Sequence, residues 1–222
     1  MQNLLHPAVS PRLGRHAGRL AAALAAAFLC LAPAHAQQPA PSAAVEPADA
    51  LLNSERIERR FGSYGIEVLE SGPVRVSNLY SLEDGRRVCR TFAVVRYPQR
   101  VEPAFAREHE AILAGGSIGA VFAAAGWRVT KHHLRYDELD STPRVEALMG
   151  RLPPAKLAAH VYVLRVERAG AAYDYAVIAE VHHPAYLAVE DLPAIYGPAH
   201  ARGAEEEAVA DAMLEIAAQK MR

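Results

Sequence analysis

The chain has 222 residues, of which 51% are hydrophobic and 22% are charged, and its formal net charge at pH 7 is −1. This length and composition are sufficient for one well-filled hydrophobic core. Because acidic and basic residues are nearly balanced, the chain offers no strongly basic surface for DNA or RNA, and we expect no nucleic-acid partner.

The first 36 residues have the pattern of an export signal. A basic region precedes an apolar run at 20–31 and an A-x-A cleavage sequence at 34–36; the basic residues are Arg12, Arg15 and Arg19. The apolar run is shorter than the roughly 20 residues that a helix needs to cross a bilayer. We therefore expect a periplasmic protein, cleaved after Ala36, with no membrane span left and a net charge of −4 because three arginines are removed.

Cys89 is the only cysteine that remains after this cleavage, so no intramolecular disulfide can form. Residues 37–48 are rich in proline, alanine and serine, which predicts a disordered tether. We assign residues 49–222 to a single domain.

The first part of the domain predicts one helix and three strands. Residues 49–61 form the helix, which Gly62 ends, and the strands lie at 66–70, 74–81 and 86–97. The Asp84-Gly85 pair between the second and third strands is a typical hairpin turn. The middle of the third strand is apolar on both faces, which is typical of a central strand.

Residues 108–127 contain four glycines and the single tryptophan. Helical spacing of Phe105, His109 and Ile112 predicts a helix that ends at the paired glycines 115–116. Ser117 is a suitable N-cap for a second short helix at 118–125.

The rest of the chain predicts three more strands and two more helices. Strands are predicted at 127–136, 160–168 and 173–181, a short helix follows Ser141, residues 185–203 are predicted to be a loop, and a helix spans 204–221. Hairpin connections imply antiparallel pairing, and grouped helices imply the α+β class. We expect a mostly antiparallel sheet of about six strands with helices packed on one face.

The glycine-rich corner is the candidate ligand site. Exposed backbone N–H groups at a helix start can bind an anion, and basic side chains on the strands could assist. The candidate ligand-binding residues are Arg90, His109, Gly116, Ser117, Gly119 and Lys131. The alternative is that the glycines only permit a tight corner between two helices.

Histidines and Cys89 are the other candidates for chemistry. His109 lies on an apolar stripe and is either a buried residue with a partner or a general base. Adjacent histidines at 132–133 and 182–183 could join His109 in a zinc site, and Cys89 could be a nucleophile, but no metal or nucleophile motif is present. We expect no metal and no cofactor.

The sequence therefore favours an exported α+β protein that binds a small anionic ligand or a partner protein without catalysis. One alternative is a small periplasmic hydrolase or lyase that uses His109 as its general base. Another is a structural protein of envelope assembly.

Overall fold

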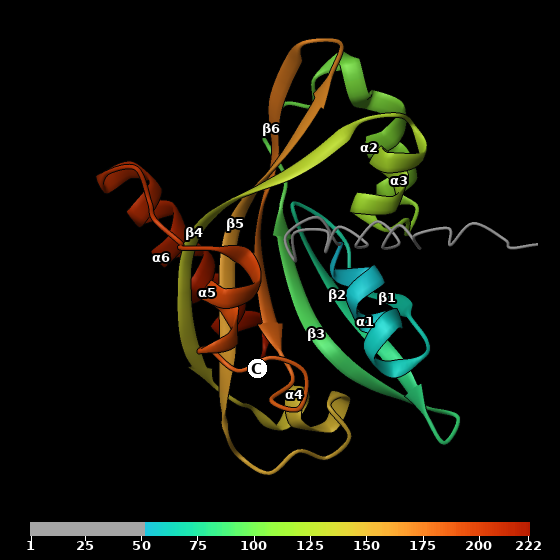
Figure 1. Ribbon diagram of the computed structural model, residues 1–222, viewed down its shortest axis with the longest axis vertical. Helices are drawn as coiled ribbons and strands as arrows, with labels where there is room; N and C mark the ends of the chain where they lie inside the picture. The colour runs from blue at the N-terminus through green and yellow to red at the C-terminus, as the bar shows by residue number, and fades with distance from the viewer. Residues whose placement is uncertain (1–51) are drawn as a thin grey trace, which may run out of the picture. The chain divides into compact units, whose positions relative to one another are not determined.

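The computed structural model describes residues 52–222, whose six strands form one antiparallel sheet (Figure 1). The strands are β1 (Gly65–Glu70), β2 (Val74–Glu83), β3 (Arg86–Arg96), β4 (Arg128–Asp140), β5 (Lys156–Arg168) and β6 (Ala171–His182). Their order is β1-β2-β3-β6-β5-β4, so two three-stranded meanders meet where β3 pairs with β6. The α+β class and the six-stranded antiparallel sheet are thus confirmed. The predicted export signal (1–36) and tether (37–48) lie outside the described residues.

Two tight hairpins follow from two-residue turn sequences. Asp84 and Gly85, between β2 and β3, have φ angles of 51° and 75°, and Ala169 and Gly170, between β5 and β6, have φ angles of 52° and 83°. Left-handed backbone at both turn positions gives a twist that matches the twist of the flanking strands. These turns therefore set the register of the two hairpins.

Residues 52–222 also form six α-helices, most of them within segments that the sequence predicts to be helical. They are α1 (Asn53–Phe61), α2 (Ala106–Leu113), α3 (Ile118–Ala124), α4 (Pro143–Leu148), α5 (Asp191–Tyr196) and α6 (Ala204–Lys220); a short 3-10 helix, η2 (Pro103–Phe105), leads into α2. The loop prediction for 185–203 is wrong at α5, because so short a helix has too few turns to show an apolar period. No helix in this part of the chain is both long enough and apolar enough to cross a membrane.

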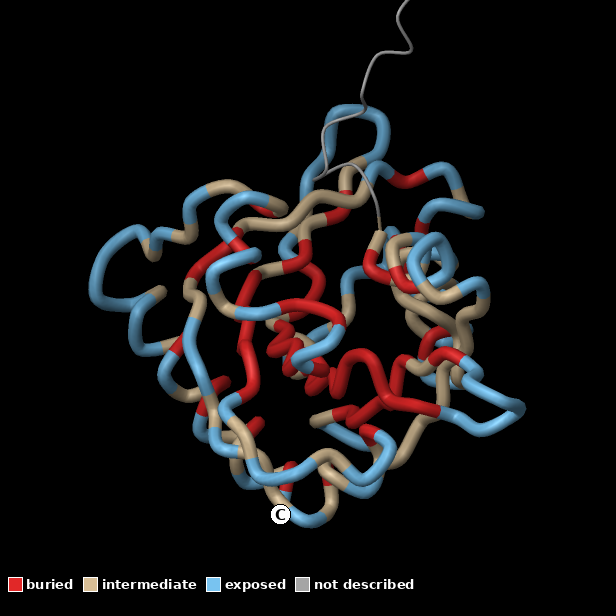
Figure 2. The backbone as a smooth tube through the Cα atoms, turned by 60° about the horizontal axis from the view of Figure 1, so that its bottom comes forward, coloured by how far each residue is buried: buried red, intermediate tan, exposed pale blue. Residues whose placement is uncertain are grey.

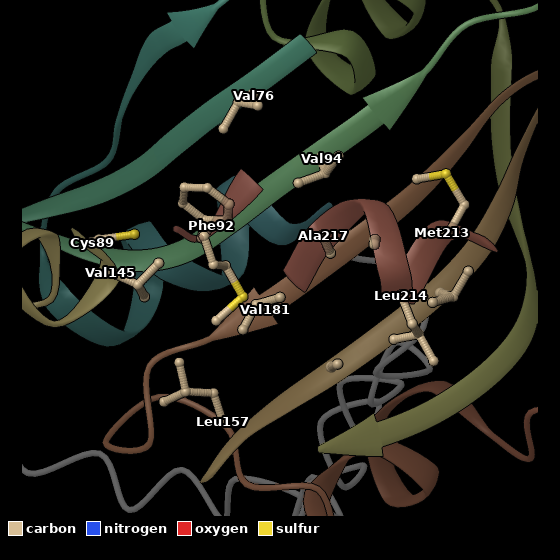
Figure 3. Close-up of a cluster of buried hydrophobic side chains, with 14 of the residues drawn as sticks. Val76, Cys89, Phe92, Val94, Val145, Leu157, Val181, Met213, Leu214 and Ala217 are labelled. Atoms are coloured by element: carbon tan, nitrogen blue, oxygen red, sulfur yellow. The ribbon is translucent and has the colours of Figure 1, made fainter. Parts of the chain in front are cut away.

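One face of the sheet packs on α4 and α6 through apolar side chains (Figure 3). Alternate strand positions point to this face. The buried cluster includes Val76, Phe92, Val94, Leu157 and Val181 from the sheet, Val145 from α4, and Met213, Leu214 and Ala217 from α6.

The opposite face packs on α1, α2, α3 and α5. Near α1 and α5 the buried residues include Ile57, Leu79 and Leu192, whereas α2 and α3 cover an aromatic cluster that contains Phe122 and Trp127. Helices therefore cover both faces, and the expectation that they pack on one face is corrected. The middle strands have long runs of consecutive buried residues, so both of their faces are covered. Buried residues are red in Figure 2.

Glu70 is the last residue of β1, which is an edge strand of the sheet, and its side chain contacts residues of α4 and α6. Its Oε1 accepts a hydrogen bond of 3.0 Å from Nη1 of Arg144, and its Oε2 contacts the ammonium of Lys220. Arg144 also donates to the backbone oxygen of Lys220 at 2.8 Å. The Lys220 ammonium, and after it the Arg144 guanidinium, lowers the pKa of the Glu70 carboxyl group.

We predict that Glu70→Gln lowers the free energy of unfolding by up to about 1 kcal/mol at pH 7, the scale of a partly exposed ion pair. Because the folded-state pKa is depressed, this stabilisation is present above the ordinary value of 4.5 and is lost as the pH falls through the folded-state pKa. Urea unfolding between pH 3 and pH 7 measures it. Glu215→Gln, on the exposed side of α6, is the control. If the two substitutions had equal effects that did not depend on pH, Glu70 would not stabilise the protein through Arg144 and Lys220.

Candidate functional site

A cavity lies between α1, the start of α3 and one face of the sheet. Its volume is about 70 Å³. Its apolar wall includes Leu79, Val95, Ile118, Leu164 and Ile178, and its polar wall includes Asn53, Tyr64, Arg75, Ser117, Lys131, Tyr162 and Glu180. A mostly apolar cavity with a few polar groups is the usual form of a small-molecule site.

The floor of this cavity continues into a row of buried polar side chains. His160 on β5 lies directly opposite Glu180 on β6, and His182 lies opposite Thr91 on β3. Glu180 and His182 are two residues apart, so both side chains point to the same face as His160 and Tyr162. These side chains are buried, and burying polar groups costs free energy unless they are hydrogen-bonded.

Asn53, the first residue of α1, connects this row to the helices. Its Nδ2 donates to Oε1 of Glu180 at 3.1 Å and to Oγ1 of Thr91 at 3.2 Å, and its Oδ1 accepts the Tyr186 hydroxyl at 2.7 Å. The Tyr162 hydroxyl also donates to Oε1 of Glu180, at 3.1 Å. One oxygen of the Glu180 carboxyl group thus receives two hydrogen bonds.

His160 and His182 each have one ring nitrogen in a hydrogen bond. Nε2 of His160 is 2.8 Å from Nδ1 of His133, and Nδ1 of His182 is 3.1 Å from Oγ1 of Thr91. The remaining polar atoms have no hydrogen-bond partner within residues 52–222: they are Nδ1 of His160, Oε2 of Glu180 and Nε2 of His182. Nδ1 of His160 and Oε2 of Glu180 are 4.0 Å apart.

Burial sets the charge of these histidines. It lowers the pKa of His182 to about 4, with Glu180 opposing the shift, and it lowers the pKa of His160 well below its ordinary value. The positive charge of Lys131 lowers both values further. Both imidazoles are therefore neutral at neutral pH.

The glycine corner borders the cavity, and much of its backbone is used in packing. Ser117 and Gly119 line the cavity together with Lys131. The N–H of Gly116 donates to the oxygen of Ala111 at 3.1 Å, and a Cβ added at Gly119 would lie 2.8 Å from the side chain of Leu52. The structure thus brings three predicted site residues together and gives Gly116 a structural role in the corner.

Arg75, rather than Arg90, is the arginine at this corner. Its Nη1 donates to the oxygens of Ile112 at 2.8 Å and Gly116 at 3.0 Å, and its Nε donates to Oγ of Ser77 at 2.8 Å. Arg90 is not among the cavity-lining residues. Its guanidinium contacts the Glu83 carboxyl group and lies 3.8 Å from the ring centre of Phe61.

The candidate general base also lies outside the cavity lining. Nδ1 of His109 is 2.8 Å from the Tyr175 hydroxyl, and its ring contacts Tyr97 in the aromatic cluster. Burial lowers the pKa of His109. Cys89 is buried on the α4 and α6 face, and burial raises the pKa of its thiol, so it is a core residue rather than an activated nucleophile.

The paired histidines separate as the strand alternation requires. His133 joins the polar row, whereas His132 points to the opposite face and contacts Glu206 at 3.0 Å. His183 lies beyond the end of β6, with its Nε2 3.2 Å from the oxygen of Met149. Sequence reasoning missed the set of His160, Glu180 and His182; the available signal was the E-x-H spacing on one strand.

No known family model matches this chain, and no curated protein matches its sequence. A function for this protein is therefore proposed from the geometry of the site.

We predict that Arg75→Met destabilises the protein by about 2–4 kcal/mol, because the buried carbonyl group of Ile112 loses its donor at roughly 1–3 kcal/mol and the partly buried carbonyl group of Gly116 loses its donor at about 1 kcal/mol. Urea unfolding measures the change. Arg107→Met, at an exposed position of α2, is the matched control and should change stability by less than about 0.5 kcal/mol. Similar losses in the two variants would show that Arg75 does not hold the corner.

Proposed function

We propose that this protein is exported and binds a small ligand with an acidic group in the cavity between α1, α3 and the sheet, without chemically altering it. The observation that carries this proposal is the polar composition of the cavity. Two cationic side chains, Arg75 and Lys131, line it against one carboxyl group, that of Glu180. The balance of charge favours an anionic group on the ligand.

Both cations line the cavity in this proposal. The guanidinium of Arg75 donates from Nη1 and Nε to two carbonyl groups and Ser77, whereas its Nη2 makes no hydrogen bond within residues 52–222 and is a donor for the ligand. The ammonium of Lys131 lies 4.7 Å from the ring centre of Tyr162 and adds positive charge to the same cavity wall. Hydroxyl groups of Ser117 and Tyr64 on the cavity wall offer further donors.

The apolar wall selects for a ligand with a hydrocarbon part. Ile118 of α3 and Leu164 and Ile178 of the sheet form a continuous part of the lining. Apolar ligand surface that is buried against these side chains contributes about 25 cal/mol to binding for each Å² removed from water. The proposed ligand is therefore a small amphipathic acid rather than an inorganic anion.

The position of His109 favours binding over the hydrolase or lyase alternative. Its ring is hydrogen-bonded to the Tyr175 hydroxyl in the aromatic cluster and does not line the cavity. A general base must reach the proton that it removes, directly or through one water. No contact among residues 52–222 gives comparable support to a role in envelope assembly.

We predict that short carboxylates such as hexanoate and benzoate raise the melting temperature, whereas hexylamine of similar size does not. Lys131→Met should weaken hexanoate binding roughly tenfold, or about 1.4 kcal/mol. Calorimetric titration measures the affinity. Lys156→Met, at the exposed far end of the sheet beside Asp140, is the control and should bind normally. Absence of binding by every carboxylate would refute the proposal.

We also predict that the protein isolated from periplasm begins at Gln37, because export removes residues 1–36. Mass spectrometry of the intact protein measures this. Ala36→Lys should block cleavage and cause the precursor to accumulate, while Ala40→Lys, just beyond the cleavage sequence, should be processed normally. A periplasmic protein that retains residue 1, or a cytoplasmic location, would contradict export.

A further inference from the structure

Three buried side chains beside the cavity gather potential metal-ligand atoms and also carry unpartnered polar atoms. One ligand atom from each of His160, Glu180 and His182 lies within 4.8 Å of the other two. The exposed fractions of these residues are 0%, 4% and 0%. The sheet fixes this arrangement, because His160 is the cross-strand neighbour of Glu180 and His182 follows Glu180 at the next position on the same face.

The unpartnered atoms are the ones that a ligand would use. Nδ1 of His160, Oε2 of Glu180 and Nε2 of His182 make no hydrogen bond within residues 52–222. Native proteins rarely leave buried polar atoms without a partner, and each such atom indicates an absent water, ion or functional role. Three of them in one place indicate a common occupant.

The other polar atom of each side chain is held in place. His133 contacts Nε2 of His160, Thr91 contacts Nδ1 of His182, and Asn53 and Tyr162 donate to Oε1 of Glu180. Metal-binding histidines almost always have such a partner on their second ring nitrogen, because it fixes the tautomer and the ring orientation. The cluster thus has both inner ligands and an outer layer of support.

We propose that His160, Glu180 and His182 form a binding site for a divalent transition-metal ion of the zinc type. Two imidazole nitrogens and one carboxylate oxygen are a known zinc ligand set that leaves a coordination position open. The imidazoles disfavour Mg²⁺ and Ca²⁺, which prefer oxygen ligands. Cys89, the only cysteine within residues 52–222, faces the opposite side of the sheet, so this part of the chain supplies no thiolate for a softer ion.

The observed distances require a small contraction on binding. Zinc bonds of about 2.0–2.2 Å place tetrahedral ligand atoms roughly 3.3 Å apart. Nδ1 of His160 and Oε2 of Glu180 are 4.0 Å apart, and the ligand atoms of all three residues lie within 4.8 Å of one another, so binding would bring these atoms closer by up to roughly 1.5 Å.

The surrounding charge defines what the open position would take. Glu180 also lines the cavity, so the open position adjoins the ligand space. Lys131 and Arg56 add positive charge near His160 and His182, which weakens cation binding and favours an anion as the remaining ligand. This replaces our expectation from the sequence that the protein holds no metal.

The test uses untagged protein of residues 37–222, because a polyhistidine tag binds the same ions. After chelator treatment, Zn²⁺ is titrated against a competing chromophoric chelator, and Co²⁺ is added separately to read the ligand field from visible absorption. We expect one equivalent of each ion and a Co²⁺ spectrum with nitrogen and oxygen ligands.

The variants locate the site. Glu180→Gln and His182→Gln should each weaken Zn²⁺ binding at least about 100-fold, and Thr91→Val about 10-fold or more through the outer layer. His132→Gln, on the same strand as His133 but on the opposite face, should bind as the wild type does. Circular dichroism of each apo variant confirms folding; if one ligand variant does not fold, the other and the wild-type Co²⁺ spectrum decide.

Failure of wild-type protein to bind stoichiometric Zn²⁺ or Co²⁺ would overturn the proposal and leave water as the occupant. An equal loss of affinity in His132→Gln would also overturn it, because that residue contacts Glu206 elsewhere. The result is independent of the carboxylate titration: the metal site can be present in a protein that binds no carboxylate, and the reverse also holds.

Discussion

The need to provide partners for Glu180, a carboxyl group buried in the middle of the sheet, organises one side of this protein. A buried carboxyl group without donors is strongly destabilising. Asn53 at the start of α1 and Tyr162 on β5 supply those donors, and Asn53 also contacts Thr91 and Tyr186. The position of α1 over the sheet is thus tied to a polar contact as well as to apolar packing.

The two faces of the sheet differ in the kind of side chains that they bury. The face under α4 and α6 is filled by aliphatic side chains and has the character of an ordinary core (Figure 3). The other face combines apolar clusters with a row of polar groups and a cavity. Strand alternation permits this division, since neighbouring residues such as Glu180 and Val181 point to opposite faces.

Arg75 shows how a charged residue can serve the site indirectly. Its guanidinium joins the carbonyl groups of Ile112 and Gly116, which lie at the corner between α2 and α3, to the sheet. That corner forms one wall of the cavity through Ser117 and Gly119. Close packing requires glycine at 116 and 119, since a Cβ at Gly116 would lie 2.9 Å from a backbone oxygen and one at Gly119 would lie 2.8 Å from the side chain of Leu52.

Local pattern alone determined the antiparallel α+β class, because turn residues, strand alternation and helical spacing are written in neighbouring positions. It also pointed to Ser117, Gly119 and Lys131, which do line one cavity. Only the tertiary structure decided that Arg75 replaces Arg90, that His109 faces Tyr175, and that His160 meets Glu180 and His182. Those contacts depend on strand register and on which strands are neighbours, and a single sequence records neither, because residues far apart in the chain meet only after the sheet has formed.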